Sequence, residues 1–211
     1  MVREQKRGEE RKERILEAAL GVFSRRGYRD AAMDEIAGES ETSKGGVYFH
    51  FPNKQTIFLA LLDRMANLLM KRAEEAIAAE PDPVKRIDAA LLVVLKTFGD
   101  HRSLARLFLV EAMGAGREFN NKMLEMRRSF AGLITRHLDD AVSEGAIPPL
   151  DTNLAGVAWF GALNEVVTHW VLESDPEPLE HQYPALRDLL RRSIGVPQST
   201  QIDNETNGNM A

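Results

Sequence analysis

The sequence contains no cysteine and no long apolar run, and each absence excludes a class of protein. Without cysteine there are no disulfides, iron–sulfur clusters, thiol nucleophiles or Cys-ligated zinc, which fits a reducing cytoplasm. No apolar stretch approaches the roughly 18 residues of a membrane-spanning helix. The opening residues, MVREQKRGEERKER, lack the apolar segment of a signal peptide. We therefore expect a cytoplasmic protein with no membrane partner.

Motifs of the common nucleotide-dependent and hydrolytic enzymes are also missing. The sequence has no G-x-x-x-x-G-K-[ST], G-x-G-x-x-G, G-x-S-x-G or H-E-x-x-H segment. Glu165 and His169 stand one helical turn apart, as two metal ligands would, but no further ligand can be located. An ordinary surface or interface pair is the simpler interpretation. We predict no catalytic residue, no metal and no cofactor.

Acidic residues outnumber basic ones, giving a formal net charge of −5. Residues 1–54 hold 11 Lys or Arg against 10 Asp or Glu, a sum of +1, and the rest hold 16 against 22, a sum of −6. The acidic excess therefore lies outside the N-terminal part. Because that part is only weakly basic, any affinity for DNA must come from placed contacts and dimerisation more than from a broad basic surface.

Two short helices separated by a polar turn are predicted near the N-terminus. The first spans Met33 to Gly38 and the second about Thr42 to His50. Val47 and Phe51, four residues apart, give the second helix one inward side. Two such helices joined by a short turn make a helix-turn-helix, whose second helix enters the DNA major groove.

Outward residues of the second helix suit that role. Thr42 or Ser43 can cap it, and its free N–H groups then form a site for a backbone phosphate. A loop is the alternative, because Gly45 and Gly46 each cost a helix about 1 kcal/mol relative to Ala; the functional interpretation is that glycine lets the backbone approach DNA. The residues predicted to contact DNA are Thr42, Ser43, Lys44, Gly45, Tyr48, His50 and Lys54.

Residues 15–58 resemble the TetR family of one-component transcriptional regulators. They include FSRRGY, DEIA and SKGGVYFHFPNK, close to the family's S-K-G-x-[LV]-Y-x-[HY]-F-x-x-K. The resemblance implies DNA contacts at the seven residues just named. Ala31 and Ala32 depart from the pattern by replacing the usual Thr or Ser, so Asp30 is the alternative cap of the first short helix. Glu41 replaces the usual turn glycine.

The remainder is predicted to be helical, so the fold class is all-α with about nine helices. The first helix runs to Arg26, with Gly27 placed as its C-terminal stop. Asn53 caps a long helix from Lys54 to about Ala79, Pro81 stops it, and Asp82-Pro83 starts the next. Further helices are expected over residues 83–98, 103–113, 118–144, 154–172 and 179–194.

Three parts follow from this pattern. Residues 1–54 form a helix-turn-helix DNA-binding domain, with a flexible arm over residues 1–8. Residues 55–195 form a larger helical ligand-binding and dimerisation domain, and residues 196–211 form a disordered tail. The basic residues of the first 14 either touch DNA or belong to a solvated helix face shared with glutamates.

The helix over residues 154–172 is apolar on more sides than a surface helix needs. The family resemblance implies that the last two helices pair with their copies in a second subunit as a four-helix bundle; burial within the monomer is the alternative. The candidate dimer-interface residues are Ala158, Ala162, Val166, His169, Leu186 and Leu190.

The resemblance also implies a small-molecule pocket among the C-terminal helices. Methionine and aromatic side chains there can adapt to varied apolar ligands, although they can equally be plain core. The candidate pocket residues are Met65, Phe98, Phe108, Met123, Met126, Phe130, Trp159 and Asn164. The segment LFLVEAMGAGREFNNKMLEMRRSF resembles family members that sense fatty acids or acyl-CoA.

We therefore expect a homodimeric repressor that binds a palindromic operator in double-stranded DNA and is released by a small, largely apolar effector such as a fatty acid or acyl-CoA. Two alternatives stay open. The first is a ligand-binding helical protein that regulates no promoter, and the second is an activator on the same scaffold.

Overall fold

Helices make up the parts of the chain that the computed structural model describes, residues 2–111 and 117–196. Within these ranges the nine predicted α-helices are confirmed and no strand occurs. In chain order the elements are α1 (Val2–Asp30), α2 (Met33–Glu39), α3 (Lys44–His50), α4 (Lys54–Ala78), α5 (Pro83–Asp100), α6 (Arg102–Arg106), η1 (Leu107–Glu111), α7 (Arg117–Ser143), α8 (Thr152–Leu172), η2 (Leu179–Gln182) and α9 (Tyr183–Ser193).

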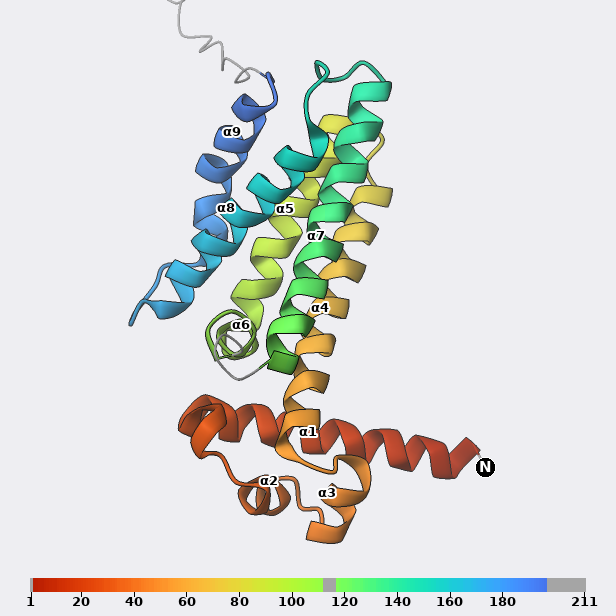
Figure 1. Cartoon of the computed structure of the whole chain (residues 1–211), viewed down its shortest axis with the longest axis vertical. Coiled ribbons are helices and arrows are strands. Elements are labelled where there is room, and N and C mark those ends of the chain that lie inside the picture. Colours follow the sequence, from red (N-terminus) through yellow and green to blue (C-terminus); the bar gives the residue numbers. More distant parts are fainter. Residues whose placement is uncertain (1, 112–116, 197–211) are drawn as a thin grey trace, which may run out of the picture.

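The first three helices lie across one end of the molecule. In Figure 1, α1 crosses the lower end of α4, with α2 and α3 beneath it, while α4, α5 and α7 run upward and α8 and α9 flank them on one side. The helical path of α1 breaks at Gly27, whose φ of 77° favours glycine, as expected for a helix stop. The flexible arm predicted over residues 1–8 is helical from Val2 onward, because Glu, Gln, Lys and Arg are strong helix formers.

α4 connects the two parts of the molecule without a linker. Its first half packs on α1, and Phe58, Leu61 and Met65 are completely buried there. Its start is capped as predicted, since the Asn53 carboxamide oxygen accepts the Thr56 N–H at 2.9 Å. The domain boundary predicted after residue 54 thus falls in the first turn of a continuous 25-residue helix.

Two segments differ from the predicted helices. The helix expected over residues 103–113 is a short α6 followed by the π-helical turn η1, and its last two residues lie outside the described ranges. The helix expected from Leu179 begins with the 3₁₀ turn η2 before α9. Of the tail predicted over residues 196–211, all but Val196 lies outside the described residues.

α7 and α8 pack tightly together at Gly156. A Cβ atom at this position would lie 2.4 Å from Thr135 Oγ1 and 2.9 Å from the Ala131 carbonyl oxygen. Because one of these neighbours is backbone, the two helices would have to move apart to accept a side chain. Gly132, also within α7, has only the flexible end of Arg136 near its would-be Cβ atom, at 4.0 Å.

We predict opposite effects for the two glycines. Gly156→Ala should lower the free energy of unfolding by about 1–3 kcal/mol through overpacking. Gly132→Ala should leave that free energy unchanged or raise it by up to about 1 kcal/mol, because alanine favours the helix. Urea unfolding followed by circular dichroism measures both. Equal effects of the two substitutions would contradict this packing.

Candidate nucleic-acid interface and ligand cavity

α2 and α3 form the predicted helix-turn-helix. Ile36 of α2 and Val47 of α3 are completely buried, and α2 packs on both α1 and α3, which fixes the outward face of α3. The turn between the helices passes through Glu41, whose φ of 51° lies in the left-handed region that favours glycine. This explains why the family pattern has glycine there. α2 begins without a side-chain cap from Asp30; the Glu35 carboxylate instead accepts the Ala32 N–H at 3.3 Å.

Ser43 is the cap of α3. Its hydroxyl oxygen accepts the Gly46 N–H at 3.2 Å, while Thr42 is turned inward and donates its hydroxyl to the Ser40 carbonyl. A Cβ atom at Gly46 would meet Thr42 Cγ2 at 2.9 Å and the capping Ser43 Oγ at 3.2 Å, so a side chain here would crowd the cap. A Cβ atom at Gly45 would meet nothing within 4 Å. The space beside Gly45 is therefore open, and its predicted contact with DNA stays a prediction.

Lys44 stands beside the α3 N-terminus and is paired in the free protein. Its ammonium donates a hydrogen bond to Asp34 at 2.6 Å, and this bond, with the carboxylate charge, raises the pKa of Lys44. The pair is exposed. A phosphate can therefore compete with Asp34 for the ammonium when DNA binds.

Lys54 differs from its expected role. Its ammonium is turned away from the outer face and donates to three carbonyl oxygens at the end of α1, at 2.9 Å to Tyr28, 2.6 Å to Arg29 and 3.1 Å to Ala31. It also lies 5.0 Å from the centre of the Tyr28 ring. These carbonyls are the acceptors left without helical partners where α1 ends, so Lys54 has a structural role in the free protein, and its contact with DNA stays a prediction.

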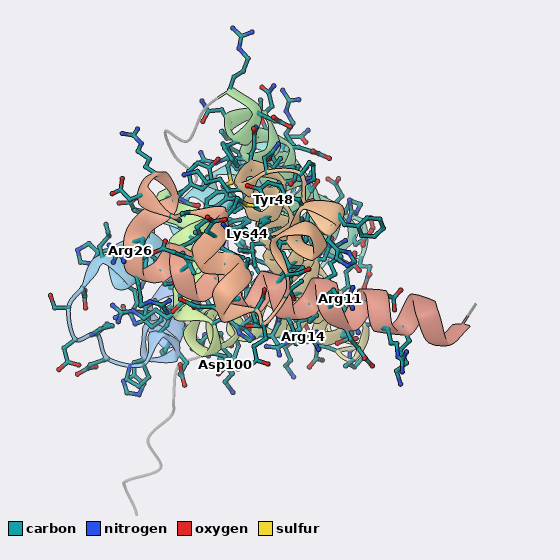
Figure 2. All side chains as sticks on the ribbon, turned by 90° about the horizontal axis from the view of Figure 1, so that it is seen from below. Arg11, Arg14, Arg26, Lys44, Tyr48 and Asp100 are labelled. Atoms are coloured by element: carbon teal, nitrogen blue, oxygen red, sulfur yellow. The ribbon has the colours of Figure 1, made fainter. Side chains whose placement is uncertain are left out.

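Three residues near the end of α3 complete the outer face. Tyr48 is 49% exposed and Phe49 is 84% exposed, and Phe49 packs edge-on against the His50 ring. Burial, followed by the charges of Arg11 and Lys12, lowers the pKa of His50 and so favours its neutral imidazole. Figure 2 looks onto this face and shows Lys44 and Tyr48 on it. Phe49 was missed from the sequence, although an aromatic residue on an outward helix position was a usable signal.

An aromatic cluster joins this module to the second half of the chain. Phe23 and Tyr28 of α1, Phe58 of α4 and Phe119 of α7 have ring centres 4.7–5.7 Å apart in five contacting pairs. Lys122 of α7 adds an ion pair to Asp63 of α4 at 2.8 Å. The end of α1 therefore contacts both helices that lead away from it.

At the other end of the molecule, the helices enclose a cavity of about 100 Å³. Its wall is apolar and comes from α4, α5, η1, α7, α8 and α9. Phe130 and Phe160 face each other in it, with ring centres 6.1 Å apart and planes inclined by 15°. The same α4 that begins at the helix-turn-helix lines the cavity with Leu69, Ala73 and Ile77.

One half-buried ion pair lies in this apolar wall. Arg191 of α9 reaches Asp88 of α5 with two nitrogen atoms, and its Nε lies 3.0 Å from Oδ1. Burial raises the pKa of Asp88, and the bond from Arg191 opposes that effect. Because 103 residues separate the partners, no local pattern in the sequence indicated them.

The structure divides the predicted pocket residues into two groups. Phe98, Phe108, Phe130, Trp159 and Asn164 line the cavity, whereas Met65, Met123 and Met126 are buried elsewhere in the core. Trp159 also donates its indole N–H to Ser193 at 2.9 Å, which connects α8 to α9.

The residues predicted at the dimer interface also fall into two groups, one on the surface of α8 and one buried within the protomer. Ala158 and His169 lie on the exposed side of α8, while Ala162 and Val166 are half-buried. His169 pairs with Glu173 at 3.1 Å and not with Glu165. Leu186 and Leu190 of α9 are buried within the protomer, and Leu190 lines the cavity. For these two leucines, burial within the monomer is the arrangement observed in the single chain.

A helix-turn-helix at one end and a cavity at the other define a DNA-binding transcriptional regulator as the class of this protein. The family model described as "Bacterial regulatory proteins, tetR family" matches residues 15–61, and "Tetracyclin repressor-like, C-terminal domain" matches residues 80–173. The chain belongs to the TetR family and is not an enzyme.

Individual relatives agree with this assignment. The HTH-type transcriptional regulator TtgR of Pseudomonas putida is 31% identical over 187 residues, covering 83% of this chain and 87% of that protein. The fatty acid metabolism regulator protein of Bacillus subtilis is 27% identical over 185 residues, covering 85% and 93%. The solved structure of FadR from Bacillus subtilis has the same fold, with a TM-score of 0.77 at 23% identity over 84% of this chain and 96% of that one.

We predict different effects of removing the two lysines. Lys44→Ala should weaken binding to a DNA site and reduce its dependence on salt by about 0.9 in log–log slope for each phosphate that the lysine neutralises, with little change in stability. Lys54→Gln should lower the free energy of unfolding by about 1.5–3 kcal/mol, because the charge-assisted hydrogen bonds to the end of α1 can no longer form.

Salt-titrated binding to a duplex selected from random DNA, together with thermal unfolding, measures both effects. An unchanged slope for Lys44→Ala would refute its phosphate contact. A Lys54→Gln protein that melts like the wild type would refute the structural role given to Lys54.

Proposed function

We propose that the protein is a homodimeric repressor of a palindromic operator and that a largely apolar effector releases it. The observation that carries this proposal is that α4 reaches from the helix-turn-helix to the apolar cavity as one continuous helix. A ligand that changes how the cavity walls pack also acts on the helix that positions α3. Binding energy at one site can then alter affinity at the other without direct contact.

The exposed side of α8 supports the dimer. Leu154, Val157 and Leu172 are 66%, 61% and 55% exposed, and Ala158 and Gly161 lie between them at helical spacing. Large aliphatic side chains and small residues on one exposed stripe suit close helix packing against a second copy. Leu189 of α9, also exposed, extends the same kind of surface.

A two-fold dimer presents two copies of α3 to one side of a duplex. For helix-turn-helix dimers, the two recognition helices enter successive major grooves about 34–36 Å apart. We infer a palindromic site with half-site centres one DNA turn apart. A ligand-bound conformer with a different spacing of the two α3 helices would fit such a site poorly, which accounts for the release of the protein from its operator.

The effector class follows from the cavity wall and from two relatives. An apolar cavity among long helices suits an alkyl chain. A regulator of fatty acid metabolism is similar to this protein over most of both chains, and the related FadR structure is a complex with stearoyl-CoA. We therefore infer that a fatty acid or its CoA thioester is the effector here.

Activation in place of repression would use the same helices, and no observation favours it. The exposed face formed by Lys44, Tyr48 and Phe49 favours regulation over simple ligand carriage, because a carrier has no use for these side chains at the end remote from the cavity.

The direct test of the proposed function is binding to the DNA upstream of the protein's own gene, with random DNA as competitor. If the protein neither binds that upstream DNA more tightly than random DNA nor selects a sequence from random DNA, the proposed function is refuted.

Breaking the exposed stripe of α8 should separate the subunits. Val157→Arg places a charge in the centre of the proposed interface, so the protein should sediment as a monomer and lose operator binding while keeping its helicity. Leu124→Arg is the matched control, since Leu124 is also an exposed aliphatic residue but lies on α7. A Val157→Arg protein that remains dimeric would place the interface elsewhere.

Narrowing the cavity should remove the response to effector. Ile134 lines the cavity and is only half-buried, so Ile134→Phe should fill space with a modest cost in stability. We expect this variant to bind operator DNA like the wild type but to resist release by stearoyl-CoA. Leu124→Phe, on the same helix outside the cavity, should respond normally. Equal release of both variants would contradict the assignment of the cavity as effector site.

A further inference from the structure

Charges on the N-terminal half of α1 are separated onto different faces of the helix. Glu13 and Glu17 share one face and turn toward α4, where Arg64 binds them at 2.8 and 2.7 Å. Arg7, Arg11 and Arg14 recur at helical spacing on another face and are exposed. Among the side chains that the structure describes, no ion pair engages these three arginines. This second set is the basic face of α1.

The basic face lies next to the end of α3. The positive charges of Arg11 and Lys12 act on His50, after burial the main reason for its lowered pKa. The Lys12 side chain points toward Phe51, with its ammonium 5.8 Å from the centre of the ring. In Figure 2, Arg11 and Arg14 lie along α1, while Lys44 and Tyr48 lie on the neighbouring helix-turn-helix. The arginines therefore continue the surface that faces DNA.

The direction of α1 indicates which part of the DNA these arginines reach. In Figure 1, the N-terminal half of α1 extends past α3 and points away from α8 and α9. If the partner subunit packs on α8, the DNA that joins the two α3 helices runs roughly parallel to α1. The N-terminus of each α1 then points away from the centre of the dimer. This step rests on the proposed dimer. The N-terminal half of α1 then lies over DNA outside the palindrome.

We propose that the basic face of α1, Arg7, Arg11 and Arg14, binds the phosphate backbone that flanks each half-site. The rise of an α-helix places Arg7 about 10 Å beyond Arg14, which corresponds to about three base pairs of duplex. Phosphate contacts position a protein without reading sequence, so the flank contributes affinity for any sequence. Residues 31–54, which contain α2 and α3, hold 2 Lys against 4 Asp or Glu, a sum of −2, so the arginines of α1 supply positive charge that these two helices lack.

Adjacent residues on different faces of α1 provide the test. Arg7→Gln removes a charge from the basic face, and Lys6→Gln removes the same charge one residue away on the side of Glu13 and Glu17. Glutamine keeps the helix propensity in both variants. The triple variant R7Q/R11Q/R14Q enlarges the effect, and K71Q/K85Q/R106Q is its control, with an equal charge change outside the helix-turn-helix domain.

Each protein is titrated with salt against a duplex selected from random DNA, with long flanks or with flanks trimmed to the palindrome. We expect the triple variant to lower the log–log salt slope of the dimer by at least about 2, one phosphate per protomer, and Arg7→Gln to lower it by part of this amount. Trimming the flanks should weaken the wild type at least about tenfold and leave the triple variant unchanged. Lys6→Gln and the distant triple control should behave like the wild type.

Selective binding by all variants with the same slope and the same response to trimming would overturn this inference and leave the proposed function standing. A wild type that selects no DNA sequence would overturn both. Arg7→Gln keeps the test independent of folding, because Arg7 is exposed and remote from the core.

Discussion

One ammonium group sets the position of the DNA-binding helices relative to the rest of the molecule. Where α1 ends beyond Gly27, three backbone carbonyls are left without helical partners, and Lys54 at the start of α4 binds all of them. Tyr28 from the same segment then packs against Phe58 and Phe119. The end of α1, the start of α4 and the start of α7 are thereby held together in a single packed joint.

Both helices that leave this joint reach the cavity. α4 contributes Leu69 and Ala73 to the cavity wall, and α7 contributes Phe130 and Ile134. Packed interiors respond to an inserted ligand by shifting whole elements, because side chains already fill the space around them. We propose that a change in the separation of α4 and α7 at the cavity alters their common contact with α1. The proposed regulation needs no further connection between the two ends.

The sequence predicted local features well, because the residues that decide them are neighbours in the chain. Ser43, Asn53 and Asp82 cap the helices they precede, and Gly27 breaks α1 as expected. The all-α fold and the helix-turn-helix follow from such signals and from apolar spacing. The family resemblance supplied the function that these signals alone could not.

Side-chain directions across the tertiary structure were less predictable. Lys54 was expected at DNA and instead binds the end of α1, because the carbonyls that attract it lie 23–26 residues earlier. Met65, Met123 and Met126 were placed in the pocket by composition, yet core and cavity wall use the same residue types. Asp88 and Arg191 escaped notice because a pair distant in sequence leaves no periodic pattern.

The central claim is that a ligand in the cavity changes the separation of the two DNA-binding modules. Because the protein has no cysteine, Gly38→Cys introduces a unique labelling site on α2, where a Cβ atom meets nothing within 4 Å. Electron–electron double resonance between spin labels on the two subunits measures the distance directly. We predict one distance for the operator complex and a distance several ångströms different when stearoyl-CoA is bound. Identical distance distributions with and without an effector that releases DNA would contradict the account.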